Sequence, residues 1–194
     1  MKKSNDPSLA GDMNTEKRIS AVIALRFADP IERLLGELTP EDDYSSGCIG
    51  RLCVEIADRG EPREVDQECF KSIFDSFMSR FDSDDAHYME QALADMLILV
   101  DEVVEMPQGS GSLETVVAGS NDWVFWWAEG ELDEIADAVD TESAPRVAWN
   151  RYQVSRLVDR VRSSLEEDGD IGSHLRNAES DGREISSWLS GDFS

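Results

Sequence analysis

Apolar residues recur at spacings of three and four along most of the chain, which is the pattern of amphipathic helices packed around a core. The clearest stripe lies within residues 62–81 and consists of Val65, Cys69, Phe70, Ile73, Phe74, Phe77 and Met78. A second stripe lies between residues 83 and 106 and consists of Met89, Leu93, Met96, Val100 and Val103. Other apolar residues at 97–99 and 104 widen the second stripe, so we expect this segment to be the central helix.

The segments before these stripes also predict helices. Over residues 15–38 the apolar pattern is interrupted at Asp29 and Pro30, a pair that favours the start of a second helix because proline suits the first helical position. Residues 20–27, SAVIALRF, are also compatible with a short buried strand. Residues 39–60 begin with a capping threonine and end at an Arg-Gly stop signal, which predicts a further helix.

In the second half of the chain, residues 107–112 (PQGSGS) predict a loop. The β-branched residues that follow favour a short strand or extended segment near 113–119. A helix is expected from Asn121 or Asp122 toward Val139. Residues 146–165 form an amphipathic helix with Val147, Val154, Leu157, Val158, Val161 and Leu165 on one face.

These elements predict a mainly α, multi-helix, bundle-like single domain over residues 15–165, with at most a short strand near 113–119. Residues 1–14 are polar, contain proline and glycine and lack periodic apolar residues, so we expect a disordered N-terminal lead. Residues 166–194 are rich in Gly, Ser and Asp, and we expect them to form a loosely held C-terminal tail.

Acidic residues dominate the charge of the chain and are unevenly distributed. The net charge is −24, from 42 acidic and 18 basic residues. Between Arg80 and Arg146 no Lys or Arg occurs, whereas 17 residues are Asp or Glu. Such a field repels nucleic acid and anionic lipid and attracts a cationic protein surface. We therefore expect a basic protein partner, and neither direct nucleic-acid binding nor membrane binding.

The acidic region contains three tryptophans, Trp123, Trp126 and Trp127. Aromatic anchors surrounded by charges are typical of protein interfaces, because the charges steer the partner and the rings hold it. The alternative places these tryptophans in the protein's own core. We predict as partner-binding residues Trp123, Trp126, Glu129, Glu131, Asp133, Glu134 and Asp137.

Basic and aromatic residues share one side of the 146–165 helix. Arg156 and Arg160 lie beside Trp149 and Tyr152, a mixture that also occurs in nucleic-acid-binding helices. Because the whole chain is so acidic, we interpret these arginines as internal partners of the protein's own carboxylates. Contact with a bound partner is the alternative for the Arg helix, residues 146–162.

No motif in the sequence specifies a reaction. The two histidines, His87 and His174, lie in no metal-binding motif, and residues 82–93 lack the glycine and the final acid of an EF-hand loop. Cys48, Cys53 and Cys69 form no CxxC pair, which favours reduced core thiols over a disulfide or zinc site. We expect no catalytic residues, no metal and no cofactor.

The sequence shows no segment that predicts insertion into a membrane. No apolar run approaches the ~18 uncharged residues of a membrane helix, because the longest, residues 96–100, is bounded by Asp95 and Asp101. Polar residues follow Lys2 and Lys3 where a secretory signal has its apolar stretch. We therefore expect the protein in the cytoplasm.

One segment resembles a known enzyme family. Residues 89–100, MEQALADMLILV, resemble the second conserved helix of all-α nucleotide pyrophosphatases of the MazG kind. The resemblance implies a Mg²⁺ site that holds nucleotide phosphates, with Glu55 and Asp58 as the upstream ligands and Asp95 as the last one. Ala92 stands where the family has another carboxylate, so the implied site is degenerate.

The charge pattern favours a non-enzymatic inhibitor or antidote that neutralises a basic protein with an acidic, Trp-edged face. An immunity or antitoxin-like protein and a DNA mimic that inhibits a nuclease or defence complex share this physics, since both offer carboxylates where phosphates would bind. The alternatives are a MazG-like pyrophosphatase and a helical protein adapted to a salt-rich cytoplasm. Only four of the basic residues are Lys, as in such salt-adapted proteins.

Overall fold

The computed structural model describes residues 7–40, 46–83, 85–106, 112–123, 154–167 and 171–188, and for residues 7–13, 155 and 188 it describes the backbone alone. Throughout these ranges the regular secondary structure is helical, which confirms the mainly α prediction. The helices are α1 (Pro7–Leu25), α2 (Ala28–Leu38), α3 (Cys48–Arg59), α4 (Glu64–Met78), α5 (Tyr88–Glu105), α8 (Val154–Glu166) and α9 (Gly172–Trp188). Residues 113–123 form one more helix.

Local signals explain several helix ends. Gly60 ends α3 in the left-handed region with φ 82°, where a residue without a side chain is favoured. The start of α5 is held by a capping box at His87, where Nδ1 accepts from Met89 N at 3.4 Å and Glu90 Oε2 accepts from His87 N at 2.8 Å. The helix therefore begins five residues after Ser83, the start that the sequence predicted.

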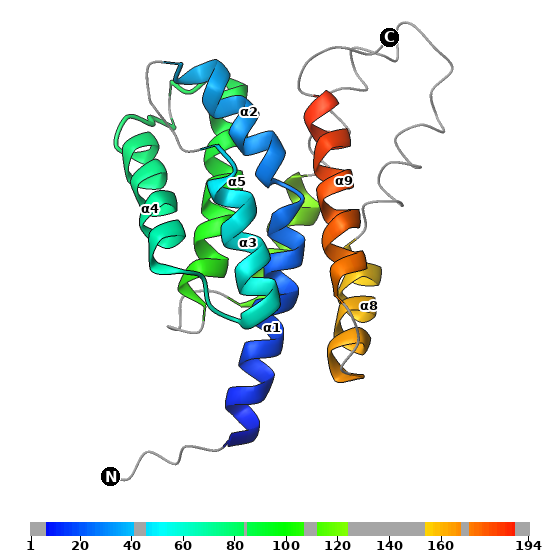
Figure 1. Cartoon of the computed structure of the whole chain (residues 1–194). Coiled ribbons are helices and arrows are strands. Elements are labelled where there is room, and N and C mark those ends of the chain that lie inside the picture. Colours follow the sequence, from blue (N-terminus) through cyan, green and yellow to red (C-terminus); the bar gives the residue numbers. More distant parts are fainter. Residues whose placement is uncertain are drawn as a thin grey trace, which may run out of the picture.

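The central helix is α1, so the prediction that the 83–106 segment occupies that position is wrong. Helix α1 contacts α3, α5, α8 and α9, and Figure 1 shows it in the middle of the arrangement, with α4 at one side and α8 and α9 at the other. Its residues 19–25 are all buried, including Ser20. The alternative of a strand at 20–27 is also wrong, because residues 20–25 belong to α1 and residues 26 and 27 form a turn.

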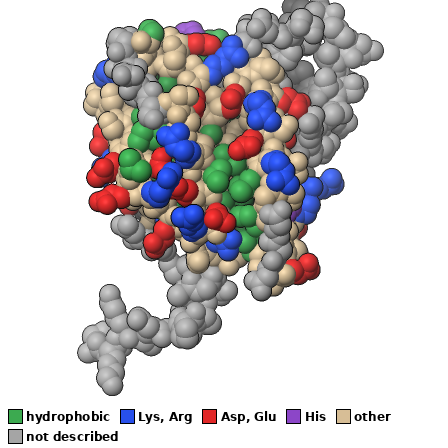
Figure 2. All heavy atoms as spheres, in the orientation of Figure 1, with side chains coloured by type: hydrophobic (Ala, Val, Ile, Leu, Met, Phe, Trp, Pro, Cys, Tyr) green, Lys and Arg blue, Asp and Glu red, His purple; other side chains and the backbone are tan. Residues whose placement is uncertain are grey.

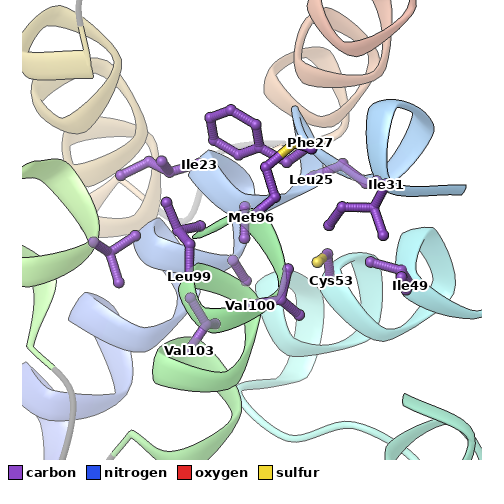
Figure 3. Packing of buried hydrophobic residues seen from close by; sticks show 14 of the residues in the cluster. Ile23, Leu25, Phe27, Ile31, Ile49, Cys53, Met96, Leu99, Val100 and Val103 are labelled. Carbon is purple, nitrogen blue, oxygen red and sulfur yellow. The ribbon is translucent and has the colours of Figure 1, made fainter. Parts of the chain in front are cut away.

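The hydrophobic core joins α1, α2, α3 and α5. Figure 3 shows Ile23 and Phe27 from the first part of the chain meeting Met96, Leu99 and Val100 of α5, with Ile49 and Cys53 of α3 and Ile31 of α2 beside them. Cys48 and Cys53 are buried free thiols. Burial raises the pKa of the Cys53 thiol to about 12, so this cysteine behaves as a small core residue.

Helix α9 packs against α1 and α2, so the prediction of a loosely held tail is wrong for residues 172–188. Arg26, itself buried, donates to Asp181 Oδ2 from Nε at 3.1 Å and from Nη2 at 2.9 Å. Arg33 Nη1 donates to the Ser186 carbonyl at 3.2 Å. Ala178 and Ile185 are buried beneath these contacts. Partners from the first forty residues thus hold a segment whose own apolar pattern is weak.

At the other end of the chain, α1 begins at Pro7, within the segment predicted as a disordered lead. The prediction is therefore wrong for residues 7–14. Proline is tolerated at the first helical position because its missing N–H would have no partner there. Residues 1–6 lie outside the described residues.

Residues 113–123 are helical, and the prediction of a short strand near 113–119 is wrong. Ser112 starts the helix, because its Oγ accepts from Thr115 N at 3.2 Å and its carbonyl accepts from Val116 N at 3.1 Å. The buried residues of the segment are spaced as on one helical face: Leu113, Val116, Ser120 and Trp123. Cap and tertiary burial together outweigh the β-branched content.

The described ion pairs involve α2, α3, α4 and α9, the turn between α1 and α2, and the residue before α4. Arg51 Nε lies 3.1 Å from Asp66 Oδ1, and Arg63 pairs with both Glu55 and Asp66. On the face shown in Figure 2, Lys and Arg side chains intermingle with Asp and Glu around a hydrophobic patch. Five carboxylates of these helices, those of Glu37, Glu55, Asp58, Asp66 and Asp181, thus have a described cationic partner.

Candidate functional site

A groove runs between α5 and the 113–123 helix. The two helices are antiparallel, because Trp123 Nε1 donates to the Ala92 carbonyl at 3.3 Å near the start of α5, whereas Gly119 lies against Leu99, further along α5. The groove has a volume of about 470 Å³. Its lining consists of Gln91, Asp95, Ile98, Leu99, Glu102, Thr115, Val116, Gly119, Asp122 and Trp123.

Apolar side chains from both helices line the groove. Leu99, Val116 and Trp123 are buried, and Ile98 is 41% exposed although it is a large hydrophobic residue. Gly119 contributes no side chain, so the groove remains open at its position. A concave apolar surface with few polar groups around it is typical of a ligand or peptide site.

The described charged residues that line the groove are all acidic. Asp95, Glu102 and Asp122 are present, and no described Lys, Arg or His accompanies them. None of the three forms an ion pair with a described Lys or Arg. Glu102 Oε2 is inaccessible to water and accepts no hydrogen bond from a described residue. An unsatisfied carboxylate oxygen is costly, so a cationic donor would stabilise it.

Two carboxylates of α5, those of Asp95 and Asp101, have raised pKa values. Burial raises the pKa of Asp95, and a hydrogen bond from Gln91 Nε2 to Oδ1 at 2.9 Å partly offsets this rise. Burial also raises the pKa of Asp101, and the nearby carboxylates of Glu105 and Glu102 add to the effect. A bound cation would favour the ionised forms of these groups.

Two smaller pockets lined by described residues differ in charge from the groove. One has a volume of about 280 Å³ and includes Arg80 beside Asp82, Asp85 and Glu90. The other has a volume of about 260 Å³ and includes Lys71 beside Asp75, Asp101 and Glu105. Each therefore has a basic residue in its lining, whereas the described lining of the groove has none.

The structure places Trp123, the described member of the predicted partner-binding set, mainly in the core. Its side chain is 5% exposed and stacks edge-on against Phe27 with ring centroids 5.1 Å apart. It is a core residue that borders the groove, not the exposed anchor that the sequence predicted. Trp126, Glu129, Glu131, Asp133, Glu134 and Asp137 lie outside the described residues.

The sequence did not predict the groove itself. Asp95 was predicted only as a ligand of the Mg²⁺ site that the pyrophosphatase resemblance implies. No binding or catalytic role was predicted for Glu102 or Asp122. The spacing of seven between Asp95 and Glu102 places them on one side of α5, two turns apart, and this signal was available in the sequence. Nothing in the sequence indicated that the 113–123 helix would lie alongside.

The arginines of α8 form no ion pairs with described carboxylates. Arg156 and Arg160 are exposed, and Arg160 Nε donates to the Arg156 carbonyl at 3.1 Å. Neither they nor Arg162 pair with any described carboxylate. The internal pairing expected for this helix is therefore absent from the described residues. Arg146, Arg151, Trp149 and Tyr152 lie outside them.

The residues that the pyrophosphatase resemblance names as metal ligands are not brought together. Glu55 pairs with Arg63, Asp58 with Arg59 at 3.5 Å, and Asp95 lies in the groove. In the described part of the chain, no group of three or more His, Cys, Asp or Glu side chains could hold a metal ion. The arrangement therefore lacks the shared carboxylate cluster that a Mg²⁺ site requires.

Comparison with known proteins adds no family. The chain matches no protein-family model, no curated protein and no solved structure. Among the described helices, none has the length and apolar content needed to cross a membrane. The groove and the charge distribution are therefore the features of the molecule that bear on its function.

Proposed function

We propose that this protein is a non-enzymatic, cytoplasmic inhibitor that neutralises a basic protein partner, as an immunity or antitoxin-like protein or as a DNA mimic. One observation carries the proposal: the groove between α5 and the 113–123 helix combines apolar residues with Asp95, Glu102 and Asp122, and among the residues that the structure describes no cation lines it. A protein that binds phosphate through Arg or Lys offers the complementary surface.

The long acidic stretch supports the same conclusion at longer range. Both helices of the groove belong to the 65 residues that contain no Lys or Arg. Their field accelerates encounter with a cationic partner, and the groove then supplies short-range contacts. A site that occupies the partner's phosphate-binding residues would block the partner's activity without chemistry of its own.

The proposal is tested by affinity capture from the native host. Wild-type protein should retain a basic protein at low ionic strength, release it at high ionic strength, and inhibit its activity when the two are mixed in equal amounts. The triple variant Asp95→Asn, Glu102→Gln, Asp122→Asn should lose at least about tenfold in affinity, because each change removes a charge without altering shape.

The matched control carries the exposed change Glu68→Gln on α4, which lies outside the groove and should leave capture unchanged. No retained protein at either ionic strength would contradict the proposal. So would a partner that the triple variant binds as well as the wild type does.

A further inference from the structure

We infer that the groove binds a basic amphipathic helix, which lies along α5 with cationic side chains two turns apart on either side of an apolar anchor. This inference rests on the proposed function, because it specifies the element that the partner presents. It follows from the spacing of the carboxylates in the groove and from the apolar surface between them.

The spacing of the acidic residues fits a helical ligand. Asp95 and Glu102 are seven residues apart on α5, which is about 10.5 Å along the helix axis. A helix lying parallel or antiparallel to α5 presents its residues i and i+7 at the same separation. Lys or Arg at these two positions therefore faces Asp95 and Glu102 simultaneously.

Between the two carboxylates lies apolar surface from both walls of the groove. Ile98 and Leu99 come from α5, and Val116 comes from the facing helix. A ligand helix places residues i+3 and i+4 between i and i+7 on the same face, so Leu or Ile there contacts this surface. The absence of a side chain at Gly119 leaves room for the anchor.

Glu102 provides an observation independent of the groove's shape. Its Oε2 is shielded from water and accepts no hydrogen bond from a described residue, although the site is negatively charged. Rotation of the Glu102 side chain would bring this oxygen into the groove, where a guanidinium or ammonium group supplies the missing donor. The positive end of a ligand helix, its N-terminus, would add attraction near whichever carboxylate it approaches.

The test uses the full chain and a fluorescently labelled synthetic peptide of about 16 residues, long enough to form three turns with frayed ends. The matched peptide carries Lys at i and i+7 with Leu at i+3 and i+4. A second peptide of identical composition carries its Lys residues at i and i+5, so that they face different sides of the helix. Fluorescence anisotropy should show at least about tenfold tighter binding of the matched peptide.

Variants of the groove separate helix docking from general attraction. Ile98→Glu adds a negative charge but removes the exposed apolar contact, so helix docking predicts weaker binding and charge attraction alone predicts stronger binding. Val65, which is 64% exposed on α4, provides the matched control, and Val65→Glu should not weaken binding. Glu102→Gln should reduce affinity at least about tenfold, and Glu68→Gln should leave it unchanged.

Filling the groove gives an independent readout. A Cβ at position 119 would lie 3.6 Å from Leu99 Cδ1, an ordinary contact, so Gly119→Ala should fold normally and Gly119→Leu should occupy the groove and abolish peptide binding. Gly36 of α2 has nothing within 4 Å of such a Cβ, and Gly36→Leu is the control for adding leucine to a helix. Circular dichroism of each variant confirms folding.

The outcomes distinguish this inference from the proposed function. Equal binding of the two peptides, stronger binding by Ile98→Glu, or unchanged binding by folded Gly119→Leu would overturn the helix-docking inference. If the host partner is nevertheless captured through the three carboxylates, the proposed function stands without it. If the matched peptide binds but no host protein is captured or inhibited, the groove inference stands and the proposed function fails.

Discussion

At the scale of single residues, the carboxylates of this protein have two kinds of surroundings. Asp66 is 3% exposed and lies between two arginines, with Arg51 Nε 3.1 Å from Oδ1 and Arg63 Nη2 2.9 Å from Oδ2, the latter as an ion pair without hydrogen-bond alignment. Asp101, in contrast, faces Glu102, Glu105 and Asp75, with Lys71 as the nearby cation. The carboxylate of Asp66 helps to hold α3 and α4 together, whereas the ionised carboxylate of Asp101 lowers the stability of the folded state.

Replacing Asp101 should therefore stabilise the fold at neutral pH. Because the folded pKa of Asp101 lies above its usual 3.8, the folded state binds more protons than the unfolded state between the two values, and the free energy of unfolding falls as pH rises through this window. Asp101→Asn removes the i,i+4 repulsion with Glu105 and should raise the free energy of unfolding by about 0.2–0.5 kcal/mol. Urea denaturation at neutral pH measures the gain.

The pH dependence provides the control for this prediction. Below pH 3.8 the carboxyl group is protonated in both states, so the advantage of Asp101→Asn should disappear. Asp66→Asn should do the opposite at neutral pH and destabilise the protein, because Arg51 and Arg63 lose their common partner. A gain for Asp101→Asn that persists unchanged at low pH would show that charge is not its cause.

At the scale of helices, strong periodicity was a reliable guide and weak periodicity was not. The stripe at 83–106, the apolar arc at Val154, Leu157, Val158 and Val161, and the stripe at 62–81 apart from its first residue face the core, as the spacing predicts, whereas Val65 is 64% exposed. The 113–123 helix and α9 were missed for different reasons. The first has β-branched residues that a cap at Ser112 and burial override, and the second depends on contacts with Arg26 and Arg33 that no local pattern reveals.

The groove shows the same limit for the candidate site. Its acidic residues and Trp123 could be located in the sequence, because charge and aromatic content are visible there. Their assembly could not, because it requires the antiparallel pairing of α5 with the 113–123 helix. Burial of Trp123 against Phe27, nearly a hundred residues away in the chain, also moved this residue from the predicted surface into the core.

Two helical glycines should respond in opposite ways to the same substitution. In α9, a Cβ at Gly182 would lie 2.8 Å from the Arg26 carbonyl oxygen. Gly182→Ala should therefore force α9 away from α1, at a cost of about 1–3 kcal/mol in the free energy of unfolding. The higher helix propensity of alanine offsets about 1 kcal/mol of this cost. Gly119→Ala meets only an ordinary contact and should stabilise by about 1 kcal/mol or less. Thermal unfolding of both variants measures the difference.

The contrast between the two positions contains its own control, since both are glycines within helices and both receive the same methyl group. If Gly182→Ala were as stable as Gly119→Ala, the close approach of α9 to Arg26 would not hold in solution. Asp181→Asn, which weakens the ion pair with Arg26 but adds no volume, should destabilise α9 without the steric effect.

At the scale of the whole molecule, the described cations and the groove occupy different helices. The described ion pairs belong to α2, α3, α4 and α9, to the turn between α1 and α2 and to the residue before α4, while α5 and the 113–123 helix contain no Lys or Arg. A protein that had acquired acid only for solubility in salt would distribute it evenly. The asymmetry instead favours a surface that recognises something positively charged.

Salt should consequently act on stability and on binding with opposite signs. Raising the ionic strength from dilute buffer to about 0.15 M shortens the screening length to about 8 Å, which weakens both the self-repulsion of a chain of net charge −24 and its attraction to a cationic peptide. The unfolding midpoint should rise, by about 2–4 °C for each kcal/mol of repulsion removed, while the affinity for the matched peptide falls. Circular dichroism and fluorescence anisotropy on the same samples measure the two trends.

The extensive apolar core should keep the protein folded even in dilute buffer, whereas a protein adapted to a salt-rich cytoplasm would be unfolded there and would regain structure only in concentrated salt. Unfolding in dilute buffer would therefore favour salt adaptation over recognition of a basic partner as the reason for the acid.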